Sequence, residues 1–109
     1  MSVKQQFSSF EELVSGSDKP VLVDFYADWC GPCQMMAKIL TQVSAEMKDE
    51  IKVAKVDTER YPELASQHKI HALPTLLLFK NGQPVDRIEG VVTADQLASR
   101  VRGVLGGDA

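Results

Sequence analysis

Cysteine and tryptophan are scarce in this sequence, and neither sign of charge dominates it. The 109 residues include two cysteines and one tryptophan, with 12 basic and 15 acidic side chains and a net charge of −3 at pH 7. Two cysteines are too few for the disulfide framework of a small secreted domain. Without a basic excess there is no electrostatic footprint for nucleic acid, so we expect no nucleic-acid partner.

Long apolar runs are also missing. The longest, Leu76 to Phe79, has four residues, whereas a membrane-spanning helix needs about 20. Residues 1–7 contain neither the apolar segment nor the small-residue cleavage site of a secretory signal. We therefore expect no membrane partner and a cytoplasmic protein, or one of the plastid stroma if a transit peptide has been removed.

Hydrophobic spacing predicts an alternation of helices and strands. Residues 20–27 are nearly all apolar and rich in β-branched and aromatic side chains, which favours a strand buried on both faces. Apolar residues recur at helical spacing from Cys33 to about Lys48, and residues 51–56 alternate like a strand. Two further helices are expected, from about Phe10 to Val14 after a capping-box spacing at residues 9–12, and from Tyr61 through about Gln67.

The last third of the chain predicts a hairpin and a closing helix. Residues 75–79 and 84–89 flank Asn81-Gly82, a strong hairpin signal, and Thr93 to Gln96 caps a helix that the glycines at 106 and 107 stop. Strands separated by helices call for parallel crossovers, and the hairpin adds antiparallel pairing. We expect an α/β fold, a single mixed β-sheet with helices on both faces, and one domain over residues 1–109.

The two cysteines are three residues apart. A disulfide between Cys30 and Cys33 would close a loop so small that the chain-entropy formula gives only roughly 2 kcal/mol of stabilisation. A chain of this length can bury a core without such help. The pair therefore indicates chemistry, either redox or metal binding.

The position of the pair favours redox chemistry. The segment from Trp29 to Cys33 follows the buried strand and opens the long helix, where unpaired N–H groups and the helix dipole stabilise a thiolate. We expect Cys30 at the exposed edge of the turn, able to attack a disulfide, and Cys33 one turn inside, able to resolve the intermediate. Gly31 would let another backbone approach, and Pro32 would stiffen the turn.

A zinc-binding module is the alternative. His68 and His71 would complete a Cys₂His₂ set with Cys30 and Cys33. The histidine spacing is at the short limit for such sites, and the proline between the cysteines is uncommon there. Otherwise both histidines would be exposed to solvent, on the second short helix and the loop after it. A redox-inactive scaffold is a third interpretation, which the intact cysteine pair argues against.

The segment from Val21 to Cys33 resembles the active-site segment of thioredoxins. The residues around Lys55, the segments 73–75 and 79–82, and Gly90 match the same family at its usual spacing. The similarity covers nearly all of the chain and is closer to bacterial and plastid thioredoxins, including the y-type group, than to animal ones. It implies a thioredoxin fold and a monomeric general protein disulfide reductase. Such a protein needs no metal or organic cofactor and is re-reduced by an NADPH- or ferredoxin-linked thioredoxin reductase.

The resemblance also implies roles for single residues. Cys30 would be the nucleophile and Cys33 the resolving thiol. Asp24 would take a proton from Cys33, with Lys55 as its charge partner, and a carboxylate in an apolar strand should have a raised pKa. Pro74 would be cis and face the cysteines. The substrate-binding surface would comprise Trp29, Gly31, Pro32, Ala72, Leu73, Pro74, Thr75, Glu89 and Gly90.

Two positions depart from the common thioredoxin pattern. Lys38 stands in the long helix where most of the family has a helix-kinking proline, and Glu89 stands where the docking surface is usually apolar or small. We expect the long helix to be straighter for this reason. Neither residue touches the cysteine chemistry, and both bear on the choice of partner.

Overall fold

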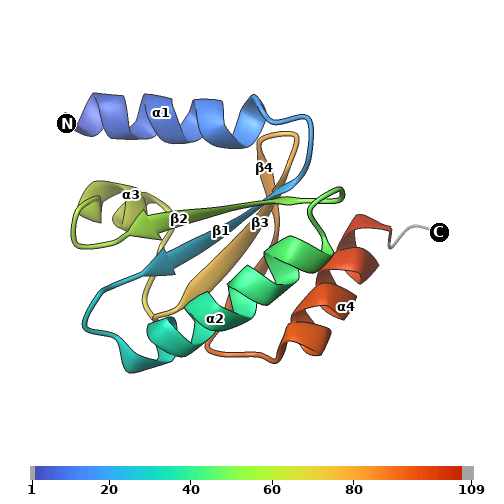
Figure 1. The fold of residues 1–109 in the computed structure, drawn as a ribbon. Helices are drawn as coiled ribbons and strands as arrows, with labels where there is room; N and C mark the ends of the chain where they lie inside the picture. The colour runs from blue at the N-terminus through green and yellow to red at the C-terminus, as the bar shows by residue number, and fades with distance from the viewer. Residues whose placement is uncertain (1, 107–109) are drawn as a thin grey trace.

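A mixed sheet of four strands lies at the centre of the computed structural model, which describes residues 2–106 (Figure 1). The strands run in the spatial order β2–β1–β3–β4, with β1 parallel to β2 and antiparallel to β3, and β4 antiparallel to β3. Their bounds are β1 Val21–Tyr26, β2 Lys52–Asp57, β3 Thr75–Lys80 and β4 Gln83–Glu89. The mixed sheet confirms the expected α/β class.

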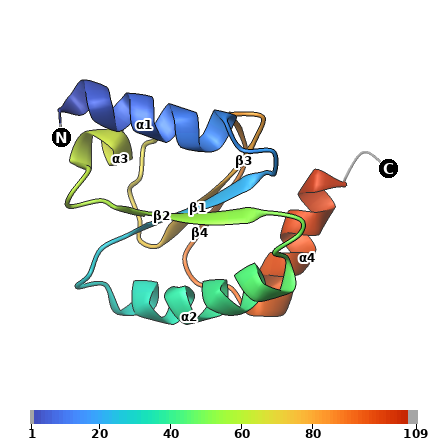
Figure 2. The ribbon, with the colours of Figure 1, turned by 45° about the horizontal axis from the view of Figure 1, so that its top comes forward.

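Helices cover both faces of this sheet, as predicted (Figure 2). Their bounds are α1 Val3–Ser15, α2 Gly31–Glu46, α3 Pro62–Gln67 and α4 Ala94–Leu105. Within residues 2–106, no helix combines the length and the apolar character needed to cross a bilayer.

Two separate cores fill the layers. One face of the sheet packs against α1 and α3, the other against α2 and α4, and β1 contributes to both. Val21, Val23 and Phe25 belong to the α1/α3 core and Leu22 to the α2/α4 core. Because side chains alternate along a strand, Asp24 shares the face of Leu22 and points toward the layer that holds α2.

Local signals placed the hairpin and the last helix correctly. Asn81 and Gly82 both have positive φ, 53° and 79°, as the two-residue turn of a twisted hairpin requires. Thr93 accepts from the Gln96 backbone N–H, and the Gln96 side chain accepts from Thr93, which completes the capping box of α4. Gly106 ends that helix, and Gly107 lies outside the described residues.

The first helix begins earlier than its sequence pattern indicated. It starts at Val3, because Ser2 and Gln5 form a capping box, and the Ser9-to-Glu12 spacing falls inside the helix. The buried positions are Gln6, Phe10 and Val14, one turn apart. A glutamine at the first of them interrupts the apolar periodicity and concealed the first half of the helix.

The expectation of parallel crossovers is right for β1 and β2 but wrong for β2 and β3. β3 runs antiparallel to β1 and is not a neighbour of β2. At about 1.5 Å per residue, the six-residue α3 spans only about 9 Å, less than half the length of the strands it joins. The chain re-enters the sheet at the end where it left, because Asp57 at the end of β2 pairs with Tyr26 and Thr75 at the start of β3 pairs with Phe25.

The connection through α3 brings four strand termini together at one end of the sheet. Tyr26 ends β1 opposite Asp57 at the end of β2, while Thr75 begins β3 opposite Glu89 at the end of β4. The segments that continue from these ends are remote in sequence and adjacent in space. The cysteine pair lies among them.

Candidate active site

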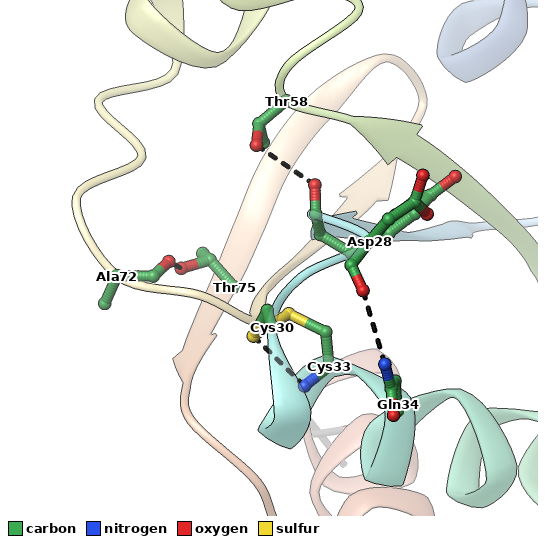
Figure 3. Close-up of a disulfide and its surroundings, with 8 residues drawn as sticks. Asp28, Cys30, Cys33, Gln34, Thr58, Ala72 and Thr75 are labelled. Carbon is green, nitrogen blue, oxygen red and sulfur yellow. Dashed lines mark hydrogen bonds between the residues drawn. A yellow bond between two sulfur atoms is a disulfide. The ribbon is translucent and has the colours of Figure 1, made fainter.

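Cys30 and Cys33 are joined in a disulfide at the N-terminus of α2 (Figure 3). Their Cα atoms are 5.2 Å apart, and Cys30 is the N-cap of the helix. The Cys33 backbone N–H donates to the Sγ atom of Cys30 at 3.2 Å. This is the predicted helix-terminal position, in which unpaired N–H groups and the dipole stabilise negative charge on sulfur.

Cys30 is more covered than the sequence indicated. The exposed fraction of Cys30 is 5%, against 3% for Cys33. The prediction that Cys30 lies at an exposed edge of the turn is therefore wrong. Ala27 belongs to the same small cluster, and Leu73 from the loop before β3 packs against it. Leu73 is more than 40 residues from Cys30 in the sequence, so no local sequence pattern could predict that it covers the cysteine.

The two cysteines open into different spaces. Cys30 lines an outer groove of about 520 Å³, and Cys33 lines an inner cavity of about 260 Å³. The outer groove is lined by Trp29, Cys30, Gly31, Pro32, Thr58, Ala65, Ile70, His71 and Leu73. The inner cavity is lined by Asp24, Tyr26, Ala27, Asp28, Cys33, Gln34, Ala37 and Lys55. Cys30 thus adjoins the outer groove, whereas Cys33 adjoins the cavity that contains Asp24.

Asp24 is the buried carboxyl of the inner cavity. It is 1% exposed, and its Oδ1 atom has no hydrogen-bond partner among the described residues. Burial withdraws water from the carboxylate and raises the pKa of Asp24 to about 6, while the charge of Lys55 opposes the rise. The raised pKa expected for a carboxylate in an apolar strand is confirmed.

Lys55 is the register partner of Asp24 on β2 and is exposed. Its Nζ atom lies 5.9 Å from the ring centroid of Tyr26, which is within range of a cation–π contact. Burial is the main cause that raises the pKa of Tyr26, and neighbouring carboxylates add to it. The charge of the Lys55 ammonium lowers the pKa of Asp24 through space rather than through a hydrogen bond.

The loop before β3 faces the cysteine pair. The Leu73–Pro74 peptide bond is cis, as the resemblance implied. The Gly90 N–H donates to the Pro74 carbonyl at 2.9 Å, which ties the end of β4 to this loop. Gly90 has a φ of +87°, a conformation that suits glycine.

The predicted substrate-binding residues differ in accessibility. Trp29 is 69% exposed, and a Cβ added at Gly31 would meet no atom within 4 Å. Ala72 and Glu89 are exposed, whereas Pro74 and Thr75 are buried and line neither space. The Thr75 hydroxyl donates to the Ala72 carbonyl, so its side chain supports the loop from beneath (Figure 3).

The structure gives the zinc alternative no support. His68 is half-buried rather than exposed, with its ring centroid 5.0 Å from that of Phe10 and 5.8 Å from those of Phe25 and Phe79. His71 is exposed, as expected, and lines the outer groove. Among residues 2–106, no group of three or more His, Cys, Asp or Glu side chains is arranged to hold a metal ion.

Two polar residues hold the site in ways that the sequence did not reveal. Thr58 donates to the Tyr26 carbonyl through its N–H at 2.9 Å and its hydroxyl at 3.0 Å. The Gln34 side-chain amide donates to the Asp28 carbonyl at 3.3 Å (Figure 3). Thr58 and Tyr26 are 32 residues apart in the sequence. Only the pairing of the ends of β1 and β2 could have predicted that they meet.

Comparison with known proteins agrees with this geometry. The thioredoxin family model matches residues 1–103. The chain belongs to the thioredoxin family. Thioredoxins are thiol–disulfide oxidoreductases, and the Cys30–Cys33 pair has the spacing and position of their redox site. The family resemblance read from the sequence is therefore confirmed.

Two groups of relatives are especially similar to this thioredoxin. Thioredoxin Y1, chloroplastic, of Arabidopsis thaliana is 59% identical over 102 residues, covering 94% of this chain and 59% of that protein. A thioredoxin-like protein of Synechocystis is 58% identical over 102 residues, covering 94% and 97% respectively. The Synechocystis protein named thioredoxin is 45% identical over 107 residues, covering 96% and 100%. The chain thus spans about three fifths of the plant protein and nearly all of the cyanobacterial ones, and the similarity to the y-type group is confirmed.

Proposed function

We propose that this thioredoxin reduces disulfides in other proteins and is then re-reduced by a thioredoxin reductase. The observation that carries the proposal is the division of the site, with Cys30 lining the outer groove and Cys33 lining the cavity that holds Asp24. The protein would act as a monomer and as a single domain over residues 1–109. The chloroplastic and cyanobacterial relatives support a place in the plastid stroma or the cytoplasm.

The first step is attack by the dithiol form on a target disulfide. The Cys30 thiolate, stabilised by the N-terminus of α2, attacks one target sulfur and forms a mixed disulfide. The target disulfide breaks, and its other sulfur leaves as a thiolate that takes a proton from water. Cys30 lines the accessible groove, which is why we assign the attack to it rather than to Cys33.

The second step resolves the mixed disulfide. Cys33 gives its proton to the Asp24 carboxylate, and the Cys33 thiolate attacks the Cys30 sulfur. The bond to the target breaks, the second target thiolate leaves, and the Cys30–Cys33 disulfide closes. The target gains two electrons that the dithiol loses, and Asp24 returns its proton to solvent through the inner cavity beside Lys55.

The outer groove would hold the polypeptide around the target disulfide. Trp29 and Leu73 offer apolar contact, while Gly31 and Pro32 leave room for a partner backbone. Pro74 would present its loop toward that backbone from the opposite side. The other residues that the sequence assigned to the substrate-binding surface would contribute from the loop before β3 and from the end of β4: Ala72, Thr75, Glu89 and Gly90.

Mass spectrometry combined with a turnover assay tests the proposal. Oxidised and reduced chains should differ by two hydrogens in intact mass, and the dithiol should accelerate insulin reduction by dithiothreitol. Cys30→Ser should abolish the acceleration. Bound zinc without turnover would instead support the metal-binding alternative.

The reductase and the oligomeric state need separate measurements. Re-reduction should be coupled to either an NADPH-linked or a ferredoxin-linked thioredoxin reductase, supplied one at a time. Sedimentation of both redox forms should give the mass of one chain. A stable dimer would contradict the proposed monomer without affecting the redox proposal.

A further inference from the structure

Three exposed carboxylates are direct sequence neighbours of residues at the site, since Asp28 precedes Trp29, Glu59 follows Thr58 and Glu89 precedes Gly90. We name Asp28, Glu59 and Glu89 the acidic rim. We propose that the acidic rim makes this thioredoxin selective for disulfides flanked by lysine or arginine. The inference rests on the proposed disulfide reduction and adds the charge of the partner.

The rim residues come from three different segments at the same end of the sheet: the turn after β1, the loop after β2 and the last residue of β4. Asp28 immediately precedes Trp29 and lines the inner cavity beside Cys33. Glu59 follows Thr58, which lines the outer groove. Glu89 is the register partner of Thr75 and precedes Gly90, which is bonded to the Pro74 carbonyl.

The rim carboxylates are not neutralised within the described part of the chain. The two ion pairs among residues 2–106 join Arg100 to Asp86 and Arg102 to Glu50, and neither involves a rim residue. The half-exposed carboxylate of Asp57 adds to the negative charge on the Glu59 side, where it accepts from the Glu59 N–H at 3.0 Å.

Lys55 on β2 and Arg60, which follows Glu59, each lie over an aromatic ring. The Arg60 guanidinium is 5.6 Å from the centroid of Tyr61, and the Lys55 ammonium is 5.9 Å from that of Tyr26. The groove itself is lined by apolar and small polar side chains, with His71 the one basic side chain among them. Among the charged residues named here, the carboxylates Asp28, Asp57, Glu59 and Glu89 outnumber the cations Lys55 and Arg60.

The charges of the acidic rim should affect the rate at which the protein and its partner associate more than the disulfide exchange itself. Charges that surround an apolar groove attract complementary partners and repel like-charged ones, mainly by changing the association rate. Each exposed pair contributes little, so three together should change rates by about three- to ten-fold at low salt. Screening should remove most of the effect near 0.5 M salt, where the Debye length is about 4 Å.

Two matched peptides provide the test. Both are cyclic disulfides of one sequence, and they differ only in having two lysines or two glutamates beside the cysteines. The second-order rate constant with which each peptide oxidises the reduced protein can be measured by fluorescence, since Trp29 is the one tryptophan in the chain and adjoins Cys30. At low salt the lysine peptide should react about three- to ten-fold faster than the glutamate peptide.

Two triple variants separate the rim from overall charge. Asp28→Asn, Glu59→Gln and Glu89→Gln together should bring the two peptide rates together. Glu12→Gln, Asp18→Asn and Asp49→Asn remove the same number of charges at exposed positions near the opposite ends of the strands, and should keep the preference. Equal rates for both peptides with the unaltered protein, or an equal loss in both triple variants, would overturn the inference. Failure to react with either peptide would instead contradict the proposed disulfide reduction.

Discussion

Asp24 and Lys55 face each other in the register of β1 and β2, yet only Asp24 is buried. The lysine extends over the Tyr26 ring and lines the same inner cavity, while Asp24 Oδ1 lacks a hydrogen-bond partner among the described residues. The partial compensation leaves a carboxyl with a pKa of about 6, which can hold a proton at one stage of a reaction and release it at another near neutral pH.

Asp24→Asn should stabilise the oxidised protein at high pH. The folded pKa is about 6 and the ordinary value is 3.8, so the folded state binds more protons and loses stability as pH rises between them. The shift corresponds to about 3 kcal/mol, the upper bound for the gain at pH 8. Urea unfolding should show a gain about 2 kcal/mol smaller at pH 4.5, with exposed Asp49→Asn as control. A gain independent of pH would contradict the charge as its cause.

The same variant should slow resolution of the mixed disulfide. Without the carboxylate, the Cys33 proton has no buried acceptor, so the second step should be slower and follow a different pH profile. Stopped-flow reduction of a protein disulfide between pH 6 and 9 measures this step. Unchanged kinetics over that range would remove Asp24 from the mechanism.

Cys33→Ser should convert the protein into a trap for its targets. Cys30 can still attack, but nothing resolves the intermediate, and mixed disulfides should accumulate. Non-reducing electrophoresis with a disulfide-containing protein detects the adduct, and Cys30→Ser is the matched control. Accumulation with Cys30→Ser in place of Cys33→Ser would reverse the two assignments.

His68 should make stability fall in mild acid. Its pKa is lowered by burial first and by Arg87 second, with Glu11 opposing, so the unfolded chain binds the proton more readily. The stability it contributes is complete above about pH 6.5 and declines below it. Because Asp24 acts in the opposite direction near this pH, unfolding is best measured in the Asp24→Asn background.

His68→Gln is the informative variant for that pH effect. It removes the ring from the phenylalanine cluster and should destabilise the fold at every pH, while flattening the decline in acid. His71→Gln, at an exposed position, is the control and should retain the decline. A decline unchanged in His68→Gln would assign it to another group.

Lys38 is expected to keep α2 straight. It lies at an exposed position inside the helix and retains a backbone N–H that a proline would remove. Lys38→Pro should therefore bend the helix and cost up to about 3 kcal/mol, whereas Lys38→Ala should do neither. Crystal structures and denaturation of both variants measure this. A sharp bend near Ala37 in the unaltered protein would contradict the expectation.

Features that depend on neighbouring residues were predictable from the sequence. The cysteine pair opens a helix because a buried strand precedes it and Pro32 suits the first turn, and Asn81-Gly82 closes a hairpin because both residues accept positive φ. These patterns located the redox pair and most element boundaries. The family motifs added the cis bond before Pro74.

Features that depend on distant contacts were not predictable. His68 was expected in solvent, but the rings around it come from α1, β1 and β3, and no spacing along the chain brings them together. Cys30 was expected at an exposed edge, but Leu73 packs against its cluster from another loop. In both cases the tertiary arrangement decided the burial of a side chain whose local position was correctly assigned.

The tie between Gly90 and the Pro74 carbonyl has a consequence for how the protein acquires its activity. The loop that faces the cysteines is fixed by the last strand, and the groove draws on residues from 29 to 73. An unfolded or truncated chain would still carry a reactive dithiol, but no groove to receive a target. Selective reduction should therefore appear only when the sheet closes through β4, so that the activity reports on completed folding whereas thiol content does not.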